Sequence, residues 1–270
     1  MQEFWSHPAA QGGVVPFVAG LVVAIALGRF KLAGLAVAVG FCACAYLLNG
    51  LAFVPLTATR KIILATLAAA AVGVVVDGAA RPARSAGIVL SLAFGVAALW
   101  VFWSVLSQRS LQEAIASGAV AAAAVGVTVW LSHRLADSPV RAGSAALGLG
   151  LGAGVAAILG ASATYGLYGI AIGAGAGAFL LVQMLTNRRT AAGWALVLPA
   201  AAGAALFAAG AVLLAKLAWY ALVPLALIPL VVRLPAPERM PVWVQAIVLS
   251  AYALAAAAAS WVLAWKFGVE

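Results

Sequence analysis

The side chains best suited to bind a metal ion or a haem are two histidines, His7 and His133, and two cysteines, Cys42 and Cys44. Cys42 and Cys44 are two residues apart, so on a helix they would point about 200° from each other and could not ligate one metal ion. Five predicted membrane spans separate His7 from His133, which argues against a bis-histidine haem because the two lie at opposite membrane faces. We therefore expect no cofactor and no bound metal.

Catalytic chemistry has little support in this sequence. No loop contains a nucleophile–base pair, a cluster of metal ligands or a phosphate-binding glycine motif, and the loops are too short to build one. The predicted spans carry no charged residue or histidine near their middle, and such residues usually mark proton relays and ion pathways. We therefore expect neither an enzyme nor a proton-coupled pump. Asp77 and Asp137, each close to arginines, are expected to be solvated loop charges.

Uncharged polar side chains within apolar segments are the remaining candidates for contact with a solute. They are Tyr46, Asn49, Tyr165, Tyr168, Gln183, Gln245 and Tyr252. Because an amide or a phenol facing lipid is unfavourable, all of them should point into a helical bundle. Their expected role is interhelical hydrogen bonding, worth about 0.6 kcal/mol on average, and contact with a solute is the alternative.

Two glycine ladders form the densest local pattern. One comprises Gly148, Gly152, Ala156 and Gly160, and the other Gly169, Gly173 and Gly177, both at four-residue spacing. Small residues one turn apart let helix backbones approach closely, so the ladders predict a tightly packed central hairpin in which they face each other. The alternative is that the glycines leave room, or exposed backbone, for a bound solute or lipid. Added bulk at Ala257, in the alanine-rich part of the tenth span, should cost less than bulk in the ladders if that stretch faces lipid.

The elements that position these residues must be membrane-spanning helices. The chain has 270 residues, of which 67% are hydrophobic and only 8% are charged. A β-barrel would need alternating apolar and polar positions, whereas this chain has long apolar runs, and a helix needs about 20 residues to cross the bilayer. The composition therefore predicts an all-α polytopic membrane bundle without a soluble domain.

The apolar runs predict about ten spans in one transmembrane domain, residues 1–270. They are Gly13–Gly28, Leu32–Leu56, Ile62–Val76, Ala86–Leu106, Ala114–Leu131, Ala142–Gly160, Tyr165–Leu185, Ala191–Leu214, Leu217–Val232 and Val242–Trp265. The third and ninth are short, so eight or nine spans remain compatible with the sequence. Ten spans would divide into halves of five, about 1–135 and 136–270, with opposite orientations, although the halves share no residue pattern.

Basic residues predict how the spans are oriented. Alternate loops carry two each: Arg29 and Lys31, Arg81 and Arg84, Arg134 and Arg141, Arg188 and Arg189, and Arg233 and Arg239. The other side receives the remaining five of the 15, including the adjacent Arg60 and Lys61, which oppose the trend. Positive charge is retained on the cytoplasmic side, so we expect a protein of the cell inner (plasma) membrane with both termini outside. The dispersed charge indicates contact with the lipid bilayer and no nucleic acid partner.

Two classes of function fit these features. The first is a small permease for a neutral or lipid-like solute, whose path would be lined by glycine backbone, amides and tyrosines. The second is a non-catalytic membrane subunit or scaffold that packs against other membrane protein subunits of a larger complex. We favour the first because most bundles with this many spans move a molecule across the membrane.

Overall fold

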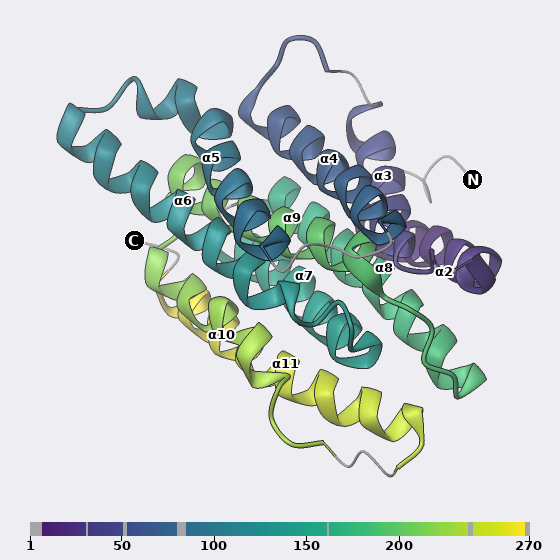
Figure 1. Ribbon diagram of the computed structural model, residues 1–270. Coiled ribbons are helices and arrows are strands. Elements are labelled where there is room, and N and C mark those ends of the chain that lie inside the picture. Colours follow the sequence, from purple (N-terminus) through teal and green to yellow (C-terminus); the bar gives the residue numbers. More distant parts are fainter. Residues whose placement is uncertain are drawn as a thin grey trace.

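The computed structural model describes residues 7–30, 32–50, 53–79, 85–160, 162–236 and 240–267. These residues form a helical bundle without a β-strand, which confirms the predicted all-α fold (Figure 1). The helices are α2 (Val15–Leu27), α3 (Leu35–Asn49), α4 (Ala58–Gly78), α5 (Ala86–Leu106), α6 (Leu111–His133), α7 (Pro139–Gly160), α8 (Ala163–Thr186), α9 (Gly193–Ala215), α10 (Val223–Val231) and α11 (Val242–Phe267).

Eight helical segments in the described part of the chain are long and apolar enough to cross a membrane. They are α4 to α9, α11, and α2 together with its flanking turns over Ala10–Phe30. The two shorter apolar segments are α3 and Trp219–Val231, which joins a 3-10 turn to α10. The chain is therefore a multi-pass membrane protein by the length and composition of its helices.

The second predicted span is shorter than expected. It was predicted over Leu32–Leu56, but α3 ends at Asn49 because Gly50 adopts the left-handed conformation (φ 62°). The N–H of Gly50 donates to the carbonyl of Tyr46 at 2.8 Å, which is a common way for a helix to end. Pro55 then follows in the connection to α4, so continuous apolar composition overstated the helix length.

The third predicted span is longer than expected. It was predicted over Ile62–Val76 and corresponds to α4, which extends over Ala58–Gly78 and is long enough to cross the membrane. The Thr57 side chain accepts the N–H of Arg60 at 3.4 Å and caps the start of α4. Arg60 and Lys61 therefore belong to the first turn of a 21-residue helix. The sequence prediction failed here because it treated this basic pair as a loop, whereas long cationic side chains at a span's end can reach the interface.

Three helices form the centre of the bundle. α7, α8 and α9 are the most buried spans, and the others surround them. α8 packs against α2 and α3, α9 packs against α4 and α6, and α7 packs against α11. α5 is paired with α6 at the periphery (Figure 1). Among the eight long spans in the described part of the chain, only α7, α8 and α9 are buried over most of their residues.

The central hairpin of α7 and α8 is present, but a different α7 face forms it. A Cβ atom on Gly150 would lie 2.7 Å from the Cα of Gly173, and one on Gly154 would lie 2.8 Å from the carbonyl oxygen of Gly166. The two backbones are thus in direct contact. Gly150 and Gly154 replace the expected Gly148 and Gly152 because glycine recurs at every second position here, and two residues turn a helix by about 200°.

Gly148 faces α11 instead, and Gly152 faces both α11 and Leu225 of α10. A Cβ on Gly148 would lie 2.7 Å from the Cβ of Ala253, and one on Gly152 would lie 3.1 Å from the Cβ of Ala257. Ala257 has no exposed surface, so the condition that this stretch of α11 faces lipid is not met at this position. α7 is therefore packed closely on two sides, which a one-sided ladder model could not describe.

The α8 ladder has one tight end and one loose end. A Cβ on Gly169 would lie 2.6 Å from the Cα of Gly154, whereas one on Gly177 would lie 3.6 Å from the nearest atom, a methyl carbon of Leu147. The latter is an ordinary van der Waals distance. α7 and α8 therefore approach closely at Gly169 and Gly173 but are farther apart at Gly177.

Arginine side chains connect helix ends on one side of the bundle. Arg233 donates to the carbonyl of Leu131 in the last turn of α6, and Arg141 donates to the carbonyl of Val232 after α10 at 2.6 Å. Cationic donors stabilise helix C-termini, where carbonyls lack partners within the helix. We call this side, where α2–α3, α4–α5, α6–α7, α8–α9 and α10–α11 are connected, the arginine face. Four other basic loop residues lie outside the described residues: Lys31, Arg81, Arg84 and Arg239.

Candidate functional site

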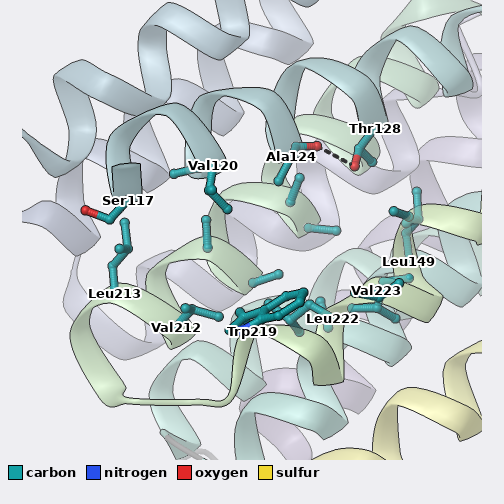
Figure 2. Close-up of a pocket in the computed structure, with 18 of the residues that line it drawn as sticks. Ser117, Val120, Ala124, Thr128, Leu149, Val212, Leu213, Trp219, Leu222 and Val223 are labelled. Carbon is teal, nitrogen blue, oxygen red and sulfur yellow. Dashed lines mark hydrogen bonds between the residues drawn. The ribbon is translucent and has the colours of Figure 1, made fainter. Parts of the chain in front are cut away.

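A cavity of about 600 Å³ opens in the side of the bundle (Figure 2). α6 forms one side, the Trp219–Val231 segment forms the other, and α7 and α9 form the back wall. Its volume lies within the range of about 300 to 1,000 Å³ that is typical of small-molecule sites. The cavity is the clearest candidate site in the described part of the chain.

Alanines form much of the cavity wall. The back wall includes Ala153 of α7 and Ala204 and Ala208 of α9, while α6 contributes Ala121 and Ala124. An alanine side chain is a single methyl group, so it fills little of the space between these helices. Elsewhere in the core, large side chains such as Phe41, Phe179 and Phe207 fill that space.

The cavity opens sideways, toward the surface that would contact lipid. The back-wall residues are buried, whereas Val120 of α6 is 62% exposed and Val223 of α10 is 48% exposed. Trp219 belongs to the side opposite α6, is 65% exposed, and its ring lies along the cavity (Figure 2). A molecule could therefore enter from within the membrane, between α6 and α10, without crossing a polar surface.

Polar groups are few and lie near the cavity's ends. The hydroxyl of Thr128 donates to the carbonyl of Ala124 at 2.7 Å, and that of Ser117 donates to the carbonyl of Glu113 at 2.6 Å. Both hydroxyls are thus used within α6. Arg109 lies at the end away from the arginine face and donates to the carbonyl of Leu213 at 3.1 Å. A guanidinium has five N–H donors, so it can also bind a polar group of a ligand.

Three of the expected site residues gather outside this cavity. Asn49 donates from its amide to the Tyr168 hydroxyl, and the Tyr165 hydroxyl lies 3.2 Å from that of Thr59. The Tyr168 ring stacks on Phe207 with ring centroids 4.9 Å apart. These contacts join α3, α4, α8 and α9 at the end of the core away from the arginine face. The structure therefore gives Asn49, Tyr165 and Tyr168 interhelical contacts and no place in the cavity wall.

The other polar candidates lie elsewhere. Gln183 of α8 has no exposed surface, and neither polar atom of its amide has a hydrogen-bond partner within the described residues. Tyr46 is 62% exposed, so the expectation that it points into the bundle was wrong. It lies one turn from the end of α3, where a phenol can reach the membrane interface. Neither residue lines the cavity.

Asp77 is a structural residue that sequence reasoning missed. It was predicted to be a solvated loop charge, but it lies in α4 and accepts the N–H groups of Trp194 at 2.7 Å and Ala195 at 2.9 Å. It therefore caps the start of α9 from another helix. Gly193 has a positive φ of 64°, and a Cβ there would lie 2.7 Å from the Asp77 carboxyl carbon. Nothing in the sequence spacing connects residues more than 100 positions apart.

Comparison with protein-family models, with curated proteins and with solved structures yields no match to this chain.

Proposed function

We propose that this protein is a non-enzymatic membrane permease that binds a lipid-like, weakly polar molecule in the alanine-lined cavity. The single observation that supports this proposal is the cavity itself, which is apolar, lies inside a membrane-spanning bundle and opens between α6 and α10. An apolar chain bound there would contact the back wall of α7 and α9. Its polar end would lie near Arg109, at the end of the cavity closest to the membrane surface.

Filling the cavity tests this proposal. Ala124 and Ala123 are both exposed residues of α6, but only Ala124 lines the cavity. Ala124→Phe would place a ring in the space that the ligand needs, whereas Ala123→Phe would add the same ring to the neighbouring surface. Binding of a fluorescent long-chain amphiphile to the purified protein should weaken by at least about tenfold, or 1.4 kcal/mol, in Ala124→Phe only.

The matched control decides between specific and general effects. Ala123→Phe should keep its affinity within about twofold, or about 0.4 kcal/mol, because its ring would lie outside the cavity. Equal loss in both variants, with both still monodisperse, would contradict binding in the cavity. Flux of the same amphiphile between leaflets of a proteoliposome should follow the binding order, since occupancy of the cavity would precede movement. Unchanged flux in Ala124→Phe would contradict the permease role.

The alternative role as a subunit or scaffold makes a different prediction for the same surface. A partner helix seated between α6 and α10 would remain bound in a mild detergent and would accompany the protein at a fixed stoichiometry. Mass spectrometry of the purified protein would detect it. We favour the permease because the cavity extends inward from the exposed side of α6 to buried alanines of α7 and α9, which gives a small molecule an enclosed wall to bind against.

We further propose that the arginine face is cytoplasmic, which places Arg109 toward the outside of the plasma membrane. The support is the excess of basic residues in the connections on that face, because positive charge is retained on the cytoplasmic side during insertion. A reporter fused after Glu270 should then be active only outside the cell, and one inserted after Arg189 only inside. Activity of the Glu270 fusion in the cytoplasm would contradict this orientation.

A further inference from the structure

A second, polar cleft of about 650 Å³ lies on the arginine face. It is bounded by the α6–α7 turn, the start of α7, the α8–α9 connection and the first turns of α11. Its polar side chains are Asp137, Ser138, Arg141, Arg189 and Gln245. This cleft is separate from the alanine-lined cavity and shares no lining residue with it.

Both guanidinium groups in the cleft are held in place by the protein. Arg141 donates through one nitrogen to the carbonyls of Val232 at 2.6 Å and Leu234 at 3.1 Å. Arg189 donates to the side-chain oxygen of Gln245 at 3.1 Å. A guanidinium has five N–H donors arranged as a planar fork, so each still has donors for a bound oxyanion. The cleft therefore presents oriented cationic donors whose positions are set before any ligand arrives.

The charge and the local backbone both favour an anion. The lining side chains include two guanidinium groups and one carboxylate, that of Asp137, while the nearby Asp77 carboxylate lies beside Gly193 and is used to cap α9. The 22-residue helix α7 begins at Pro139 within the cleft, and a helix N-terminus carries a partial positive charge. Apolar residues such as Val140 and Leu249 complete the wall. This combination suits a group with an anionic head and an apolar remainder.

We propose that the cleft binds the phosphate group of an anionic phospholipid. Phosphate oxygens fit the paired donors of a guanidinium, and basic pockets between membrane helices at the cytoplasmic side bind lipid head groups. A free phosphate ion would share the same donors but would make no use of the apolar wall or of the position at the membrane surface. The lipid would rest on α7 and α11 and hold the α8–α9 connection against them.

Arg189 and Arg188 provide a matched pair for the test. Both are exposed and adjacent in the chain, but only Arg189 lines the cleft. Arg189→Gln removes one cleft charge, Arg188→Gln removes one charge beside it, and Arg189→Lys keeps the charge without the planar fork. The delipidated proteins would be titrated with short-chain phosphatidylglycerol, with the matching phosphatidylcholine, or with inorganic phosphate, and thermal unfolding would be followed in each case.

Phosphatidylglycerol should raise the unfolding temperature of the unmodified protein and of Arg188→Gln equally. The lipid concentration that gives half the rise should increase by about tenfold or more in Arg189→Gln, with an intermediate value in Arg189→Lys. If Arg188→Gln and Arg189→Gln weakened phosphatidylglycerol binding equally, the lipid would be attracted by the general surface charge, and binding in the cleft would be contradicted. A rise with phosphatidylcholine of the same size would overturn the anionic specificity, and a rise with inorganic phosphate alone would overturn the lipid as the ligand.

Discussion

Gly150→Ala is expected to lower the free energy of unfolding by about 1 to 3 kcal/mol, which is the usual cost of overpacking a close-packed core. The added methyl group would lie 2.7 Å from the Cα of Gly173 and 2.9 Å from the carbonyl oxygen of Gly169. These are backbone atoms of α8, so no side chain can rotate away. α7 cannot retreat either, because α11 packs against its other side. Thermal unfolding in detergent would measure the loss.

Gly177→Ala is the matched control on the same pair of helices. Its methyl group would meet its first neighbour at 3.6 Å, so there is no clash to relieve. Alanine also has a higher helix propensity than glycine by about 1 kcal/mol in a helix interior. The variant should therefore be as stable as the unmodified protein or slightly more stable. If Gly150→Ala were equally tolerated, the close contact of α7 with α8 would be wrong.

Asp77→Ala is expected to cost about 1 to 3 kcal/mol, because it removes a helix cap and leaves two backbone N–H groups without their acceptor. Those groups belong to Trp194 and Ala195 at the start of α9, the most buried span of the bundle. Asp137→Ala is the control, since that carboxylate is exposed in the α6–α7 turn and should change stability by less than about 0.5 kcal/mol. Equal effects of the two variants would contradict the capping role.

A double-mutant cycle with Gly193→Ala would sharpen this test. Alone, Gly193→Ala should destabilise the protein through its positive φ and through the clash with the Asp77 carboxylate. In an Asp77→Ala background the clash is absent, so the second substitution should cost less. Strictly additive losses would show that the two residues do not interact.

The fold could be predicted from the sequence where the signal was composition, and not where it was a particular side chain. Long apolar runs predicted helical spans because lipid cannot satisfy exposed backbone groups. The end of α3 at Asn49 depended instead on the left-handed conformation of Gly50 within a segment that stays apolar. Likewise, Arg60 and Lys61 indicated a loop, but the Thr57 cap brought them into α4.

The sites were harder to predict because they depend on which faces meet. The glycines of α7 occur at alternate positions, so the sequence could not tell whether Gly148 or Gly150 would face α8. The cavity arises where alanines of α6, α7 and α9 converge, and an alanine run alone is equally compatible with a lipid-facing surface. Asp77 caps a helix that begins more than 100 residues later, a contact that only the assembled bundle defines.

Photoaffinity labelling would test most directly whether the cavity binds a lipid-like molecule. The purified protein would be irradiated with a long-chain amphiphile carrying a photoreactive group on its chain, and the labelled residues would be identified by mass spectrometry. We expect labelling to concentrate on α6 and the Trp219–Val231 segment, at cavity residues such as Val120, Ala124 and Val223. Leu92 of α5 is 66% exposed and does not line the cavity, so it reports general contact with lipid. Labelling of Leu92 as strong as that of Ala124 would contradict a ligand site in the cavity.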